Sequence, residues 1–100
     1  MNKQTFEYKF RIGHNNDTRK PEYKKAERIF IRNGIKGFSN NKNILGYWES
    51  NSEKSFIIEV LATEENPFND TIAFKIKSEL EKELKQFLVL VSKAEVMTIE

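Results

Sequence analysis

The sequence predicts an α+β fold whose elements follow in the order strand, helix, strand, strand, helix, strand. Three patterns support this prediction. Residues 5–12 alternate strictly between apolar and polar side chains, which is typical of a strand with one buried face. Residues 44–62 read as two strands joined by a few turn residues, which indicates a hairpin. Residues 72–87 carry apolar side chains at helical spacing.

The first strand is the most clearly patterned element. One face carries the apolar side chains Phe6, Tyr8, Phe10 and Ile12. The other face carries Thr5, Glu7, Lys9 and Arg11. Because successive side chains of a strand point to opposite sides of the sheet, we expect the aromatic face to pack against the helices.

A loop and the first helix follow this strand. Residues 13–18 have the composition of a loop, and Asp17 or Thr18 is expected to cap the helix, with Pro21 in its first turn. Tyr23, Ala26, Phe30 and either Ile29 or Asn33 then recur at helical spacing. The pair Asn33-Gly34 is a typical helix end.

The hairpin occupies the middle of the chain. Residues 35–43 form a polar connection, and residues 44–49 read as the second strand. Residues 50–53 read as the turn, and residues 55–62 as the third strand. The buried face of the third strand is predicted to carry Phe56, Ile58 and Val60.

The last two elements are a helix and a strand. Asn69 or Asp70 is expected to cap the helix, and Phe68 to pack back on it. The apolar stripe of the helix comprises Ile72, Ala73, Ile76, Leu80, Leu84 and Phe87. Residues 87–91 read as the fourth strand, with residues 95–99 as a candidate extension.

No linker, repeat or low-complexity segment divides residues 1–100, so we expect a single domain. The order of elements resembles the ferredoxin-like fold over essentially the whole chain. This resemblance implies a four-stranded antiparallel sheet with both helices on one face. The hairpin with Trp48, Glu53 and Ser55, and the later segment Gln86-Phe87-Leu88-Val89, are also similar to small uncharacterised bacterial and phage domains. That second resemblance implies no activity.

Composition excludes several classes of function. The chain has 17 Lys and Arg, 15 Asp and Glu, one His and no Cys. It therefore cannot hold a disulfide framework, a thiolate zinc site or a cysteine nucleophile. No apolar run approaches the roughly 20 residues of a membrane span, and no signal-peptide core follows Met1, so we expect a cytoplasmic protein. An abundance of Lys, Asn and Ile hints at an AT-rich genome, such as that of a phage or a low-GC bacterium.

The loop between the first strand and the first helix is a candidate binding site. Backbone N–H groups, a helix N-terminus, an imidazole and nearby cations together suit a small anion. The candidate ligand-binding residues are Arg11, His14, Asn15, Arg19 and, from the hairpin, Trp48. The loop matches no phosphate-binding fingerprint, so an ordinary capped loop is the alternative.

Three other chemistries are open. The first helix could bind nucleic acid through Lys20, Lys24, Lys25, Arg28 and Arg32, although the third strand lacks the glycines of an RNA-recognition motif. His14 could act as a general acid or base in a small enzyme. His14 could also bind a metal with Asp17 and either Glu49 or Glu59. With so few ligand residues, we expect no metal, no cofactor and no catalytic residue.

The face of the sheet without helices bears on self-association. We expect it to carry Glu7, Lys9, Arg11, Ile57, Glu59 and Leu61, together with Leu88 and Leu90 or their neighbours. An aliphatic patch on an open sheet usually marks an interface, so we expect a homodimer. The sequence thus favours a small, non-enzymatic, self-associating protein that binds a protein partner or a small anionic ligand, such as an accessory factor of a phage or bacterium.

Overall fold

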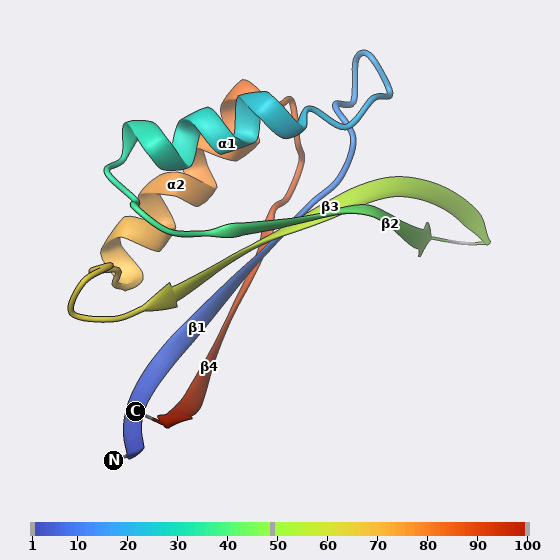
Figure 1. The fold of residues 1–100 in the computed structure, drawn as a ribbon. Coiled ribbons are helices and arrows are strands. Elements are labelled where there is room, and N and C mark those ends of the chain that lie inside the picture. The colour runs from blue at the N-terminus through green and yellow to red at the C-terminus, as the bar shows by residue number, and fades with distance from the viewer. Residues whose placement is uncertain (1, 49, 100) are drawn as a thin grey trace.

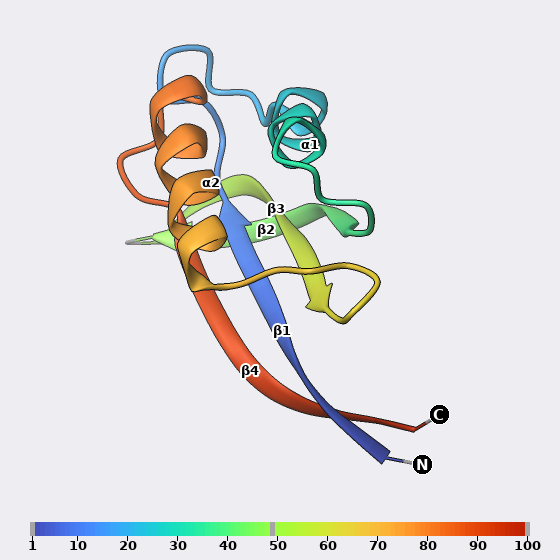
Figure 2. The same ribbon diagram turned by 90° about the vertical axis from the view of Figure 1, so that its left-hand side faces the viewer.

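Six regular elements form one sheet covered by two helices. The structure is a computed structural model that describes residues 2–48 and 50–99, apart from the side chains of residues 2–4, 48 and 98. The elements are β1 (Asn2–Ile12), α1 (Tyr23–Arg32), β2 (Ser39–Trp48), β3 (Asn51–Ala62), α2 (Asp70–Glu83) and β4 (Leu90–Ile99). The strand order is β2-β3-β1-β4, with every neighbouring pair antiparallel. Both helices lie on one face of the sheet, which confirms the predicted ferredoxin-like α+β fold (Figures 1 and 2).

The core lies between the sheet and the helices. The alternation of β1 places Tyr8, Phe10 and Ile12 in this core, where the ring of Phe10 meets that of Phe30 edge to face at 5.0 Å. Burying a large apolar side chain of this kind contributes roughly 1.5–3 kcal/mol. Phe6, which we expected on the same buried face, is 40% exposed. The expectation is wrong because β1 and β4 continue past the start of α2, so no helix covers this position (Figure 2).

Helix α1 begins later than its sequence suggests. Its N-cap is Glu22, which makes no side-chain capping bond, so the expected cap at Asp17 or Thr18 is wrong. The amides of these two residues are instead bonded to the side chain of Asn15, which keeps residues 15–20 in a tight loop. The predicted helix end is confirmed. Asn33 is the C-cap, and Gly34 has a φ of 81°, a conformation that favours glycine.

Helix α2 begins as expected but ends earlier. Asn69 caps it by accepting a hydrogen bond from the Ile72 amide at 2.9 Å. Leu84 completes the buried stripe, and Lys85 then turns the chain with a φ of 54°. Phe87 is 94% exposed, so placing it in the helix stripe was wrong. The fourth strand starts at Leu90 and runs through the candidate extension, because residues 85–89 are needed to bring the chain back to the sheet.

Strands β2 and β3 are longer than predicted. β2 starts at Ser39 rather than Ile44, and β3 at Asn51 rather than Ser55. The early part of β2 is polar, yet Asn41 is held on the sheet by donating to a carboxylate oxygen of Glu59 at 2.9 Å. One extra residue in β2 between Asn41 and Ile44 makes a bulge against β3.

The molecule measures 46 × 28 × 19 Å, because two ribbons project from the covered centre of the sheet (Figure 1). One is the terminal ribbon, in which residues 2–6 of β1 pair with residues 95–99 of β4. The other is the hairpin of β2 and β3, which projects in the opposite direction. In the part of the chain that the structure describes, no helix has the length and apolar character that crossing a membrane requires.

Candidate functional site

A cleft opens where the end of β1 meets the β2–β3 hairpin. It encloses about 310 Å³. Its lining residues are Arg11, Ile12, Gly13, Gly46, Tyr47, Glu53 and Ser55. We call this space the hairpin cleft. It lies beside two of the residues singled out from the sequence, Arg11 and His14.

The end of β1 is fixed tightly at the cleft. A side chain at Gly13 would place its Cβ 2.5 Å from Oε1 of Glu53, so only glycine fits here without displacing Glu53. Gln86, from the connection between α2 and β4, accepts a hydrogen bond from the Gly13 amide at 3.2 Å. The amide nitrogen of Gln86 also donates to the carbonyl oxygens of Gly13 and His14. These hydrogen bonds tie the end of β1 to the connection between α2 and β4.

Arg11 and Glu53 line the cleft, and the imidazole of His14 lies beside Glu53. Arg11 is exposed at the end of β1. The side chain of His14 is only 15% exposed, with Nε2 3.8 Å from Oε2 of Glu53 and Nδ1 3.2 Å from the Asn15 carbonyl oxygen. Arg11 can bind an anion, whereas Glu53 can accept from hydroxyl or amino groups. Sequence reasoning missed Glu53 and Gln86 as site residues, because only the fold brings them to the end of β1.

Asn15 organises the loop rather than facing the cleft. It is 6% exposed, and its side chain accepts from the amides of Asp17 and Thr18 and donates to Glu22. The amides of residues 15–20 all have partners, so an anion at this loop would have to be held by side chains. Arg19, with a φ of 63°, is exposed and does not line the cleft. The side chain of Trp48 lies outside the described part of the structure.

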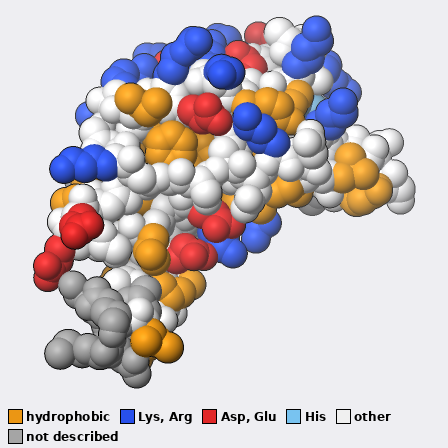
Figure 3. All heavy atoms as spheres, in the orientation of Figure 1, with side chains coloured by type: hydrophobic (Ala, Val, Ile, Leu, Met, Phe, Trp, Pro, Cys, Tyr) orange, Lys and Arg blue, Asp and Glu red, His pale blue; other side chains and the backbone are white. Residues whose placement is uncertain are grey.

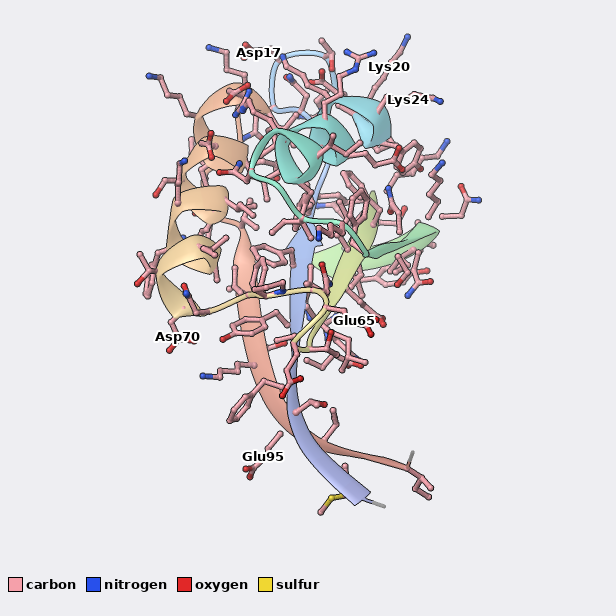
Figure 4. All side chains as sticks on the ribbon, turned by 60° about the vertical axis from the view of Figure 1, so that its left-hand side comes forward. Asp17, Lys20, Lys24, Glu65, Asp70 and Glu95 are labelled. Carbon is pink, nitrogen blue, oxygen red and sulfur yellow. The ribbon has the colours of Figure 1, made fainter. Side chains whose placement is uncertain are left out.

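The basic first helix is partly neutralised by acidic neighbours. Arg32 donates to Glu79 at 2.7 Å and to Glu83 at 2.6 Å, both from α2. Lys25 lies 3.8 Å from a carboxylate oxygen of Glu22. The other cations proposed for nucleic-acid binding, Lys20, Lys24 and Arg28, are exposed. Lys and Arg side chains line the upper edge of the surface in Figure 3, and Figure 4 shows Lys20 and Lys24 around the start of α1.

A second cavity, of about 210 Å³, lies between α2 and β4, and we call it the α2–β4 cavity. Its lining residues are Tyr8, Asp70, Ala73, Phe74, Lys77, Val91, Ser92 and Lys93. At one end, Tyr8 donates to Oδ1 of Asp70 at 2.6 Å, and Lys93 donates to the same oxygen at 3.0 Å. Burial and the bond to Asp70 raise the pKa of Tyr8, while the Tyr8 and Lys93 donors hold the pKa of Asp70 below its usual value.

The described residues contain no group of three histidine or carboxylate side chains arranged to hold a metal ion. Of the residues considered for such a site, Glu49 lies outside the described part of the chain. The acidic neighbour that the structure gives His14 is Glu53.

Comparison with known proteins supports the fold. No protein-family model and no curated protein sequence matches the chain. A nitrogen regulatory PII-like protein from Thiomonas intermedia K12, solved with ADP, AMP and bicarbonate, is similar in structure. Its TM-score is 0.61 at 12% sequence identity, over 100% of this chain and 98% of that one.

Two further solved structures are similar. A PII-like signalling protein from Thermus thermophilus has a TM-score of 0.56 at 15% identity, covering 98% of this chain and 91% of that one. A phage SAM lyase in complex with S-methyl-5′-thioadenosine has a TM-score of 0.61 at 16% identity, covering 96% and 90%. At these identities the likeness establishes the ferredoxin-like fold, on which binding proteins and an enzyme are both built.

Proposed function

We propose that the protein is a self-associating, non-enzymatic binding protein whose hairpin cleft takes a small anionic ligand. The observation that carries this proposal is the exposed Arg11 on a cleft of about 310 Å³. Small-molecule sites typically occupy about 300–1,000 Å³ and place a few polar groups on a largely preformed surface. The hairpin cleft has this size, and the side chain of Gln86 bonds to the backbone of Gly13 in its wall.

Adenine nucleotides are the ligand class to test first. Two of the proteins of similar fold are described with adenosine compounds, the Thiomonas intermedia PII-like protein with ADP and AMP and the phage SAM lyase with S-methyl-5′-thioadenosine. In this chain Arg11 would bind phosphate, and Glu53 would accept from the ribose or the adenine amino group. Tyr47, 69% exposed at the cleft, offers an aromatic face for a base.

Calorimetric titration with AMP, ADP, ATP and bicarbonate tests the proposal. We expect at least one of them to bind, and Arg11→Ala to weaken that binding by about tenfold or more, because hydrogen bonds to charged groups contribute roughly 1.5–3 kcal/mol. Lys9→Ala is the matched control, since Lys9 lies two residues away on the same face of β1 but does not line the cleft. Equal loss in both variants would indicate general charge attraction and contradict a site at the cleft.

The non-enzymatic part of the proposal is tested with the same samples. After incubation with each nucleotide, and separately with S-adenosylmethionine, we expect chromatography to recover the compound unchanged. Turnover that His14→Ala abolishes in a folded protein would contradict this part and would favour acid–base chemistry at His14. If no small molecule binds, the remaining proposal is a protein partner, such as a host factor bound by a phage or bacterial accessory protein.

A further inference from the structure

Strand β4 forms an exposed edge of the sheet along its whole length. All ten of its residues pair with β1, from Leu90 opposite Arg11 to Ile99 opposite Asn2, with no bulge. Its other side faces no strand among the residues that the structure describes. A long, regular edge strand is a template for further pairing unless a bulge or proline interrupts it, and β4 has neither. The opposite edge, β2, has a bulge between Asn41 and Ile44.

The helix-side face of β4 has two unlike halves. Val91 and Lys93 lie against α2, beside the α2–β4 cavity. Met97 and Ile99 lie on the same face of the terminal ribbon, past the start of α2, and are 62% and 86% exposed. Glu95 stands between Lys93 and Met97 along the strand. Figure 4 shows it beyond Asp70, which begins α2. One half therefore has a cavity beside it, and the other half has uncovered apolar side chains.

We propose that two copies of the chain pair β4 with β4, antiparallel, around a two-fold axis at Ala94. The two sheets would then form one continuous eight-stranded sheet with all four helices on the same side. This inference deepens the self-association in the proposed function, names its interface, and is independent of what the hairpin cleft binds. Because directly opposite residues of an antiparallel pair lie on one face, the helix-side residues of one copy meet those of the other.

Charge selects this register. With the axis at Ala94, Lys93 of one copy faces Glu95 of the other, twice. Moving the axis by one residue places Lys93 opposite Lys93, or Glu95 opposite Glu95, and like charges directly opposite destabilise a strand pair. Glu95 is exposed, and among the described residues it forms no ion pair within its own chain. Lys93 is already bonded to Asp70 of α2 at 3.0 Å, with its ammonium 4.4 Å from the centre of the Phe6 ring of β1, so the Glu95 of the partner would add a second carboxylate to this charge.

The same register places an apolar side chain beside the α2–β4 cavity. Met97 of one copy lies opposite Val91 of the other, next to Phe74, which is 69% exposed. At about 210 Å³ the cavity is smaller than most small-molecule sites, which suits a single side chain. Methionine is unbranched and flexible, so it fills irregular spaces of this kind well. Pairing would thus cover the exposed half of β4 with the α2 of the partner.

Single cysteines test the register, because the chain has none of its own. In Ala94→Cys the two thiols would face each other across the axis, with Cβ atoms about 4.5–5.5 Å apart. Ser92→Cys is the matched control, on the same exposed face two residues away. Its two thiols would be about 14 Å apart, four strand positions at about 3.4 Å each. Under mild oxidation we expect a disulfide-linked dimer from Ala94→Cys and none from Ser92→Cys.

Other outcomes overturn specific parts of the proposal. Cross-linking of Ser92→Cys alone would place the axis elsewhere and contradict the register. A native mass spectrum showing a dimer, without cross-linking of either variant, would retain self-association but reject β4 as its interface. A trimer would also reject it, because a two-fold contact between edges closes with two copies. A monomer at every concentration would reject both self-association and this interface, whereas the nucleotide titrations would still report on the cleft.

Discussion

At the residue scale, Asn15 shows how one buried amide can shape a loop. Its side-chain oxygen accepts from two backbone amides, and its side-chain nitrogen donates to Glu22. Its own backbone amide and carbonyl bond to Lys20 and Arg19. These bonds satisfy backbone groups that would otherwise be unpaired beside the first helix.

Asn15→Ala is therefore expected to destabilise the protein by about 1–3 kcal/mol, because it leaves two amides without their acceptor. Urea denaturation followed by fluorescence measures this difference. Asn16→Ala is the control, since Asn16 contacts Lys85 through its backbone amide. Equal stability of Asn15→Ala and the native protein would show that water replaces the acceptor and that Asn15 does not hold the loop.

Sequence reasoning could predict only those residues of the candidate site that lie close together along the chain. Arg11 and His14 follow directly from the strand and loop pattern of residues 5–18; in the structure Arg11 lines the hairpin cleft, and His14 lies 3.8 Å from Glu53 beside it. Glu53 and Gln86 reach the same place although they lie 40 and 73 residues from Gly13 along the chain, and no short-range pattern encodes that proximity. Asn15 was predicted to bind a ligand because its side chain can both donate and accept hydrogen bonds. In the structure that side chain is buried, and it bonds to the loop instead.

At the scale of elements, α1 and α2 are joined by a polar clamp. Arg32 of α1 bonds to Glu79 and Glu83 of α2, and the side chain of Asn33 donates to Glu79 at 2.9 Å. The Arg32 hydrogen bond holds the pKa of Glu83 below its ordinary value of 4.5. Burial alone would raise the pKa of Glu79, but the Asn33 and Arg32 bonds outweigh it and lower that pKa as well.

These shifts predict a loss of stability in acid. Since the folded pKa values lie below the unfolded ones, the unfolded chain binds more protons as the pH falls through about 4.5, and the clamp's contribution is lost below that pH. Arg32→Met is expected to flatten the fall in stability between about pH 5 and pH 3. Urea denaturation at a series of pH values measures this. Arg28→Met, on the exposed side of the same helix, should keep the native slope.

The end of α2 allows a sharp comparison of two apolar residues of the predicted stripe. Leu84 is 1% exposed and Phe87 is 94% exposed. Leu84→Ala is expected to cost about 2–5 kcal/mol of stability, because it opens a space in the core. Phe87→Ala should change stability by less than about 0.5 kcal/mol. Denaturation curves for both variants test this, and a large loss at Phe87 would mean that an interface or a ligand covers it.

The same pair shows why the fold was predictable while element ends were not. Helical spacing continues through Phe87 because 84 and 87 are three residues apart, so periodicity alone cannot place the end of the helix. The end is set by Lys85 in a left-handed conformation and by Glu81, whose side chain accepts from the Val89 amide at 2.9 Å. Likewise the polar start of β2 has no apolar alternation and is held by pairing with β3.

At the scale of the whole molecule, the protection of backbone amides from hydrogen exchange should differ along the sheet. The centre lies under the helices, whereas the terminal ribbon and the hairpin do not (Figure 1). In dilute protein, amides of residues 95–99 and of the hairpin tip are expected to exchange with deuterium faster than those of residues 56–60. At high concentration, β4 pairing should slow exchange at edge-facing amides along the whole of β4, on both sides of Ala94, and leave the hairpin unchanged. Slowing confined to the hairpin would instead indicate association through that end.

The bulge in β2 limits how far an assembly can grow. A sheet in which both edge strands can pair with another chain could add copies at both edges and polymerise into a fibre. Here Asn43, with a φ of 61°, adds an extra residue to one edge, and Lys42 beside it carries an exposed charge. Each copy would then have one edge strand, β4, that can pair with another chain, and dimer formation would occupy it. In concentrated solution we expect the oligomer size to stop at the dimer, with no turbidity. Deletion of Asn43 would make β2 a regular edge strand and should lead to filaments.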